Sequence, residues 1–220
     1  MRFERHSANA PIGMMEMIDK VMRLKEIYDA YDAVAASFKN AAACERGCAF
    51  CCTDAGTIDI TTLEAMAIRD ALTRLPRSRQ IGLKKSLATD MKRRLAGKPS
   101  ACPFLMKSLV CDIYAVRPFS CRRIYSMHRC SREAPPVVSR QAMAAAAASI
   151  GALQRLDDTG YSGHLSIVLF MLDQPRFLDT YRAGAFRPEE IAAFGKSHGI
   201  VINRMAAATT MGPGDVSKSR

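Results

Sequence analysis

Cysteine is the residue type in this chain whose number and spacing are best suited to chemistry. All eight cysteines lie between residues 44 and 130, and the stretch CERGCAFCC at 44–52 holds four of them. The others are Cys102, Cys111, Cys121 and Cys130. Cysteines that only fill a core would be spread among helical positions without regard to their proximity in the sequence. The confinement therefore indicates that these thiols share one task.

Metal coordination is the chemistry that this spacing favours. Thiolates are soft, compact ligands, and a zinc ion takes about four of them at about 2.3 Å. Cys44, Cys48 and Cys51 have the Cys-x3-Cys-x2-Cys spacing of a loop that can wrap one ion, and Gly47 allows a tight bend. Cys52 is harder to place on the same ion, so a second metal, a bridging role and packing all stay open for it. Reactive or structural thiols are the alternative for the whole group.

The later cysteines lie in surroundings that suit metal ligands. Pro103 fixes the backbone directly after Cys102, as the proline after a ligating cysteine does in ferredoxin loops. Arginines follow or flank the next cysteines, at Arg117, Arg122, Arg123, Arg129 and Arg132. A cluster bound by thiolates is anionic, and these guanidinium groups can compensate its charge when it is buried. His128 beside Cys130 either completes a mixed site or is a surface histidine.

These motifs resemble the YkgJ-type cysteine-cluster family, bacterial proteins described as having a zinc- or iron-chelating domain. The similarity covers Cys-x3-Cys-x2-Cys-Cys at 44–52, CPFL at 102–105 and CDIYAVRPFSCR at 111–122. It implies a metal site made by the cysteines in register with the family, namely Cys44, Cys48, Cys51, Cys52, Cys102, Cys111 and Cys121. Cys130 lies outside the shared motif, so the resemblance assigns it no role.

The identity of the metal stays open, because zinc and iron–sulfur clusters both accept all-cysteine sites. The arginine-rich surroundings and the Cys-Pro dipeptide favour an iron–sulfur cluster, of the 4Fe-4S type, over zinc. The expected function is that of a cytosolic metal-binding protein whose centre is structural, redox-active or sensing. Its redox or protein partner is not identified by the sequence.

An enzyme that uses the cluster is the alternative function. A flagellin lysine methylase carries a similar cysteine pattern, so a protein lysine methyltransferase is one form of this alternative. Cys44, Cys48 and Cys51, with Phe50 before the third, also satisfy the radical S-adenosylmethionine pattern. That pattern belongs after the first strand of a parallel α/β barrel, whereas here a helix is expected before it. The sequence has no nucleophile-elbow, phosphate-loop or HExxH motif, so no catalytic residue is assigned.

Composition places the chain among globular proteins. It has 220 residues, of which 49% are hydrophobic and 24% are charged. This length and this hydrophobic share are enough for a conventional core without disulfides. Glu16 and Asp19 interrupt the only apolar run near the N-terminus, so we expect no secretory signal, no membrane association and a cytoplasmic location. Thiols stay reduced in that compartment, which weakens the disulfide interpretation.

The net charge of +11 suggests a nucleic-acid partner only superficially. A surplus of lysine and arginine attracts polyanions without specificity. The chain contains no tryptophan and no basic stripe interleaved with aromatic residues. The sequence therefore argues against nucleic-acid binding and favours a solvated basic surface.

Helical periodicity dominates on both sides of the cysteines. The apolar spacing predicts helices over 14–39, 78–95, 139–158, 163–174 and 176–182, and another that opens at Pro188. Thr61 and Glu64 have the capping-box spacing that opens a helix after an extended piece at 57–60. The expected buried face of the 78–95 helix consists of Ile81, Leu83, Leu87, Met91 and Leu95. Residues 100–130 should hold no regular element longer than about two turns.

We therefore expect a mainly α-helical protein, with one domain wrapped around an irregular, cysteine-rich metal-binding core. Its expected parts are a flexible N-terminus at 1–13, a cysteine-cluster region at 14–135, a C-terminal helical region at 136–205 and a mobile tail at 206–220.

Overall fold

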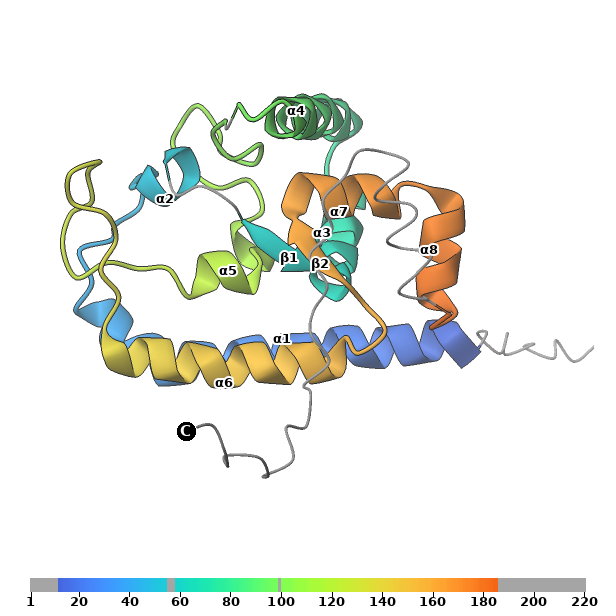
Figure 1. The fold of residues 1–220 in the computed structure, drawn as a ribbon, viewed down its shortest axis with the longest axis horizontal. Helices are drawn as coiled ribbons and strands as arrows, with labels where there is room; N and C mark the ends of the chain where they lie inside the picture. The colour runs from blue at the N-terminus through green and yellow to red at the C-terminus, as the bar shows by residue number, and fades with distance from the viewer. Residues whose placement is uncertain (1–11, 55–57, 99, 186–220) are drawn as a thin grey trace, which may run out of the picture.

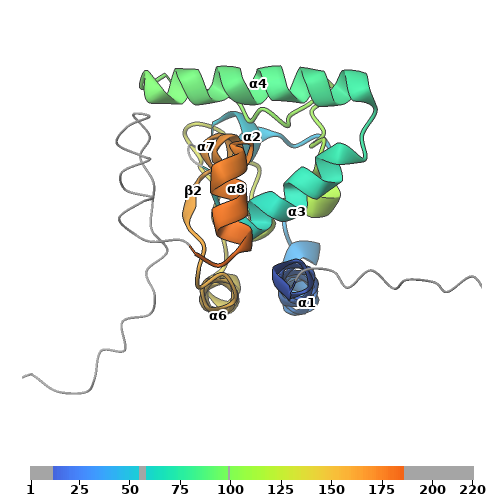
Figure 2. The same cartoon turned by 90° about the vertical axis from the view of Figure 1, so that its right-hand side faces the viewer.

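The computed structural model describes residues 12–54, 58–98 and 100–185 and is mainly α-helical, as predicted. Helices α1 (Ile12–Asn40) and α6 (Arg140–Leu156) lie side by side along one side of the molecule (Figures 1 and 2). Helix α4 (Arg77–Leu95) crosses the opposite side. Between them lie α3 (Thr62–Thr73), α7 (Leu165–Leu172) and α8 (Pro175–Arg182). In the described residues, no helix is both long and apolar enough to cross a membrane.

A two-stranded antiparallel sheet sets the position of the central helices. Strand β1 (Asp59–Thr61) pairs with β2 (Ser162–His164), with Ile60 opposite Gly163. Each strand runs directly into a helix, β1 into α3 and β2 into α7. The pairing therefore holds the N-termini of two central helices together, although the strands are about a hundred residues apart in the sequence.

The capping box predicted at the start of α3 is present. The Thr61 hydroxyl accepts the Glu64 backbone N–H at 3.0 Å, and the Glu64 carboxylate accepts the Thr61 N–H at 2.8 Å. These two bonds satisfy backbone donors that the helix itself leaves unpaired. The strand-to-helix junction beside the cysteine loops is therefore fixed locally.

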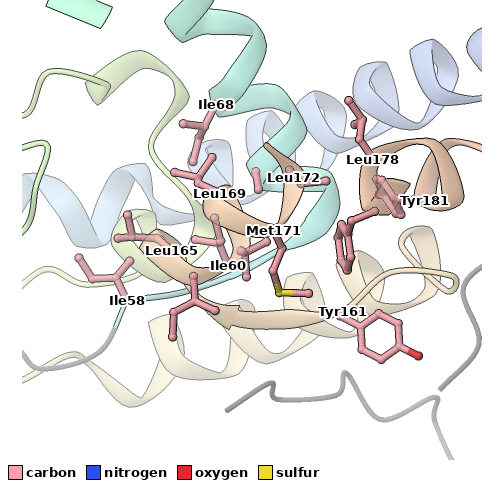
Figure 3. Close-up of a cluster of buried hydrophobic side chains, with 14 of the residues drawn as sticks. Ile58, Ile60, Ile68, Tyr161, Leu165, Leu169, Met171, Leu172, Leu178 and Tyr181 are labelled. Carbon is pink, nitrogen blue, oxygen red and sulfur yellow. The ribbon is translucent and has the colours of Figure 1, made fainter. Parts of the chain in front are cut away.

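Two groups of buried side chains form the core. The larger one joins β1, α3, α7 and α8, with Ile60, Ile68, Leu169, Leu172 and Tyr181 among its members (Figure 3). The smaller one lies between α1, α3 and α6. It takes Leu24, Tyr28, Tyr31 and Ala35 from one face of α1, at the spacing that places residues on a single helical stripe.

Helix α4 corrects one prediction about burial. Leu83 is buried and Leu87 and Met91 pack against the core, but Ile81 and Leu95 are each 45% exposed. Positions 83, 87 and 91 follow each other at intervals of four on the helix that contacts α7, and Ile81 lies around the helix from that row. Leu95 continues the row but is the last residue of α4. The apolar pattern therefore overestimated the extent of the buried face.

The cysteine loops are irregular, as predicted. The described elements of 100–130 are a 3-10 turn η1 (Tyr114–Val116) and a one-turn helix α5 (Phe119–Arg122). Another one-turn helix, α2 (Phe50–Thr53), carries the end of the first cysteine group. Residues 163–164, predicted as the start of a helix, belong to β2 instead, because they pair with β1. The helix predicted at Pro188 and the tail from 206 lie outside the described residues.

Candidate metal centre

The first cysteine group is shaped by a bend and a single helical turn. Gly47 has a positive φ of 92°, the conformation that glycine adopts without steric cost, and this provides the predicted bend before Cys48. The Cys48 N–H donates to the Glu45 carbonyl at 3.0 Å. Helix α2 then begins, and the Cys52 N–H donates to the Ala49 carbonyl at 2.8 Å. The local chain thus turns twice within nine residues.

The second group is tied to the first through the backbone. The Cys102 N–H donates to the Cys52 carbonyl at 2.7 Å, although 50 positions separate the two residues. An isolated antiparallel bridge joins Leu105 to Cys111 and folds the following loop back on itself. Cys121 sits on α5, where its N–H donates to the Pro118 carbonyl at 2.9 Å. These bonds bring three separate stretches of loop to one place.

A single pocket collects the cysteines of both groups. Its volume is about 860 Å³. The cysteines on its lining are Cys44, Cys48, Cys51, Cys52, Cys102, Cys111 and Cys121. Neither Cys130 nor His128 is on this lining, and the His128 ring lies 3.4 Å from the Ala134 carbonyl instead. The seven predicted residues therefore share this lining, and Cys130 lies off it but close enough to Cys44 to help raise the pKa of that thiol.

The depth of the cysteines within the pocket differs. Cys44 and Cys48 are exposed, whereas the other cysteines of the lining are partly buried. Cys102, Cys111 and Cys121 also pack against the larger core group. Positions of the deep thiols are thus fixed by the core, while the two outer thiols belong to a surface loop.

All eight cysteines are free thiols. Within the described ranges, no three side chains of His, Cys, Asp or Glu already stand in an arrangement that could hold a metal ion. The thiols line the same pocket, and coordination requires them to come closer together than they are in this structure.

The adjacent thiols of Cys51 and Cys52 shift each other's pKa in opposite directions. The Cys52 thiol hydrogen-bonds to Cys51 and lowers the pKa of Cys51 to about 7, with Arg117 contributing in the same direction. The same bond raises the pKa of Cys52, and burial adds to that increase. Cys51 is therefore the thiol best prepared to act as a thiolate near neutral pH.

The other partly buried thiols favour the protonated form. Burial raises the pKa of Cys102 to about 11 and raises the pKa of Cys121 further, with neighbouring thiols adding to the effect. Burial also raises the pKa values of Cys44 and Cys111. A buried group of thiols resists collecting negative charge without a cation. The donor set therefore fits a thiophilic metal centre, whose positive charge replaces the protons.

The predicted arginines divide into two groups. Arg117 and Arg123 line the pocket. Arg122 faces away from it, since it donates to Asp32 at 2.9 Å and to the carbonyls of Arg117 and Ala115. Arg129 and Arg132 are also absent from the lining. Arg132 forms an ion pair with Asp54. Only part of the local positive charge is thus available to a bound group.

Arg117 has the environment of a charge-compensating residue. Its guanidinium lies 4.0 Å from the centre of the Tyr114 ring. Its Nε is buried and has no hydrogen-bond partner among the described residues. Its charge acts on the pKa of Cys51, Cys111 and Cys121. A thiolate-bound centre would give this nitrogen an acceptor.

Several pocket residues were not predicted as site residues. Arg46 lies within the first cysteine group and Leu109 lies in the loop before Cys111. The position of Arg46 between Cys44 and Cys48 was a signal that the sequence offered. Leu109 carried no comparable signal, because its role depends on the path of an irregular loop.

The surroundings differ from those of a radical S-adenosylmethionine barrel. The first cysteine group follows the long helix α1, and the two strands of the described residues pair antiparallel. Cys44, Cys48 and Cys51 therefore do not follow a strand of a parallel barrel in the part of the chain that the structure describes.

Comparison with known proteins gives a family for this region. No curated protein and no solved structure matches the chain. Residues 43–144 match the family model CxxCxxCC, described as a "putative zinc- or iron-chelating domain". The matched segment contains all eight cysteines and the whole second group of loops. The resemblance to a cysteine-cluster family is thus confirmed over residues 43–144, which are similar to the CxxCxxCC domain.

Proposed function

We propose that the protein holds an iron–sulfur cluster, of the 4Fe-4S type in preference to zinc, through thiols of the pocket. The observation that carries the proposal is that seven cysteines from two remote segments line one pocket. The proposed ligands come from this set, and the centre has a structural, redox or sensing role in the cytoplasm. A redox or protein partner would then use the face of the protein near the exposed Cys44 and Cys48.

The charge beside the thiols supports a buried, thiolate-bound centre. A four-thiolate centre in a partly buried pocket needs cationic neighbours. Arg117 lies beside the deep thiols with a buried Nε that lacks a partner among the described residues. Donors of this kind, directed at sulfur, raise the reduction potential of iron–sulfur centres.

The chain's own residues divide the work of holding such a centre. Cys102, Cys111 and Cys121 offer sulfurs from positions fixed against the core. Cys51 offers a thiol whose pKa is already lowered to about 7. Cys44 and Cys48 close the outer side from a surface loop. When bound, an iron–sulfur cluster would supply one-electron transfer, and zinc would supply cross-linking of the loops without redox chemistry.

Metal analysis and visible spectroscopy of protein purified without oxygen test the proposal. We expect a brown protein with broad absorption near 400 nm, typical of thiolate-to-iron charge transfer, and bleaching by dithionite if the centre is redox-active. Colourless protein with stoichiometric zinc would replace the iron–sulfur assignment with zinc. Protein that binds neither metal after reconstitution would contradict the proposal.

Cysteine variants identify the ligands. We expect Cys121→Ser and Cys48→Ser to lower the metal content, because both residues line the pocket. Cys130→Ser is the matched control, because Cys130 is also a partly buried free thiol but lies off the lining. Equal metal loading in the wild type and Cys48→Ser would remove Cys48 from the ligand set. A full loss of metal in Cys130→Ser would move the centre away from this pocket.

An enzyme that uses the cluster, such as a protein lysine methyltransferase or a radical S-adenosylmethionine-like enzyme, is the second candidate. The observation that favours it is the pocket volume of about 860 Å³, which is within the range of small-molecule sites. A metal-dependent transfer of a methyl group from S-adenosylmethionine to a lysine amine of a protein, with release of S-adenosylhomocysteine and a proton, would support this candidate. A metal centre that only changes the melting temperature would favour the structural role.

A further inference from the structure

We propose that the cysteine pocket also binds a small organic anion, with an apolar body and one acidic group, beside the metal centre. This inference rests on the proposed metal centre and adds a ligand class to it. The supporting features are the size of the pocket, two free arginines at its edge, an apolar wall and a strained leucine.

The pocket is larger than its thiols need. A tetrahedral zinc–thiolate site with bonds of about 2.3 Å encloses roughly 50 Å³. A four-iron cluster is larger but still occupies only part of the measured pocket of about 860 Å³. Sites for small organic ligands fill roughly 300–1,000 Å³. Space for a second group therefore remains beside a centre held by the thiols.

The charges of the lining select an anion for that space. Arg46, Arg117 and Arg123 line the pocket, against Glu45 and Asp59 as the acidic residues of its lining. Arg117 is closely associated with the thiols, since it acts on the pKa of three of them. In the described part of the chain, Arg46 and Arg123 form no ion pair. These two guanidinium groups are therefore available for a carboxylate, phosphate or sulfonate.

The rest of the pocket wall is apolar, which favours an apolar body on the ligand. Ile58, Ile68 and Leu165 belong both to the pocket lining and to the larger core group, and Figure 3 labels all three in that group. Phe104 and Ile113 continue this wall. These side chains are only 1–7% exposed, so they present a narrow apolar edge to the pocket, and such an edge suits an aliphatic or aromatic group by excluding water.

Leu109 adds an observation that is independent of charge and volume. Its φ of 59° lies in the left-handed region, and it is the only residue other than glycine with positive φ in the described ranges. The tight turn around it is closed by hydrogen bonds from the Met106 N–H to the Val110 carbonyl and from the Leu109 N–H to the Met106 carbonyl. The side chain lines the pocket although it is 50% exposed. A leucine held in this strained form at the edge of a pocket is suited to covering a ligand.

The test uses 8-anilinonaphthalene-1-sulfonate, which has an aromatic body and one sulfonate, with metal-loaded protein. We expect one equivalent to bind with enhanced, blue-shifted fluorescence. The double variant Arg46→Gln/Arg123→Gln should weaken its binding about tenfold, the amount expected for a lost charge-assisted hydrogen bond. Arg129→Gln/Arg140→Gln removes the same charge from residues off the lining and should leave binding unchanged.

The uncharged analogue N-phenyl-1-naphthylamine separates the acidic group from the apolar body. We expect its binding to be insensitive to both double variants. Leu109→Gly is the second variant: it should raise the melting temperature by relieving strain while weakening both probes, a combination that simple loss of folding cannot produce.

Metal content measured on each sample distinguishes the two proposals. If the wild type holds no metal, the proposed function fails. If the wild type holds metal but the pocket variants bind the sulfonate probe as well as the wild type does, the anion site is wrong and the metal centre stands. If Arg46→Gln/Arg123→Gln loses metal in parallel with the probe, these arginines only compensate the centre, and the anion site is again overturned.

Discussion

Glu64 accepts a hydrogen bond from the backbone N–H of Phe119 at 2.7 Å, although the two residues are 55 positions apart. The same oxygen accepts the Tyr28 hydroxyl at 2.6 Å. The other carboxylate oxygen caps the N-terminus of α3 through Thr61. One buried side chain therefore joins α1, the strand-to-helix junction and the short helix that carries Cys121.

Replacement of Glu64 should destabilise the fold and loosen the second cysteine group. Glu64→Ala leaves the Tyr28 hydroxyl and the Phe119 N–H without their acceptor in the core, which we expect to cost about 3 kcal/mol of unfolding free energy. Urea denaturation measures this loss. We also expect a lower metal content, because Phe119 lies two positions before Cys121.

Glu26→Ala is the matched control for this experiment. Glu26 is an exposed glutamate on α1, so its removal should change the unfolding free energy by less than about 0.5 kcal/mol. Equal losses in the two variants would show that the buried network around Glu64 does not stabilise the protein as its geometry indicates.

The comparison of sequence with structure at Glu64 shows what pattern reasoning can reach. The capping box was predictable, because it depends on two residues three positions apart. The bonds to Tyr28 and Phe119 depend on how α1 and α5 pack around α3, and no local pattern encodes that packing. Similarly, the family resemblance predicted which seven thiols share a pocket, whereas the path of the loop that places Leu109 at its edge was not predictable.

The error on α4 has the same origin. Apolar residues at 81 and 95 suit a helical stripe when the helix is considered alone. The extent of the buried face is set by the neighbouring elements, which bury Leu83 but leave Ile81 and the terminal Leu95 exposed. Sequence periodicity therefore gave the helix correctly but not the extent of its buried face.

Asp157 should make the free energy of unfolding fall as pH rises, whereas a salt-bridged aspartate would make it rise. It is 1% exposed and accepts hydrogen bonds from the Tyr181 hydroxyl, the Thr62 hydroxyl and the Leu63 N–H. Burial outweighs these bonds and the nearby Lys20, and it raises the pKa of the carboxyl above its ordinary value. The folded protein therefore binds this proton more tightly than the unfolded chain does.

The sign of the effect follows from that difference. As pH rises from about 4 toward the higher folded pKa, the unfolded chain releases the proton first, so the free energy of unfolding falls. We expect the stability difference between wild type and Asp157→Asn to shrink as pH rises through this window. Urea denaturation of both proteins at several pH values measures it. A difference that grows with pH would mean that Asp157 is held charged in the folded state.

Gly160 should not tolerate even one added methyl group. A Cβ built on Gly160 would lie 2.2 Å from the Asp157 carboxyl, which its hydrogen bonds hold in place. We expect Gly160→Ala to lower the unfolding free energy by about 1–3 kcal/mol, the usual cost of forcing an extra carbon into a packed site. Thermal unfolding followed by circular dichroism measures the change.

Gly82→Ala is the matched control for that substitution. Gly82 lies inside α4, has nothing within 4 Å of its added Cβ, and does not have positive φ. Alanine is a better helix former than glycine, so we expect a gain of about 0.5–1 kcal/mol. If Gly160→Ala also stabilised the protein, the Asp157 carboxyl would have to be free to move aside.

Removal of the metal should loosen the cysteine loops before it affects the helical core. The described packing of α1 with α6 involves none of the pocket thiols, so those two helices keep their own buried contacts. Among the described residues, segments 44–52 and 100–121 are joined by one backbone hydrogen bond, from the Cys102 N–H to the Cys52 carbonyl.

A ligand present at about a thousand times its dissociation constant adds about 4 kcal/mol to the unfolding free energy. For a chain of this size, its removal should lower the melting temperature by about 10 °C. Amide hydrogen exchange should show the loss of protection concentrated in the two loop segments and nearly absent in α1 and α6.

Two variants serve as controls when a chelator removes the metal. In Cys102→Ser, which already lacks a proposed ligand, the chelator should produce little further change, whereas Cys130→Ser should respond as the wild type does. Uniform loss of protection over the whole molecule would instead mean that the metal centre stabilises the entire core. Identical melting temperatures before and after metal removal would mean that it stabilises neither the cysteine loops nor the core.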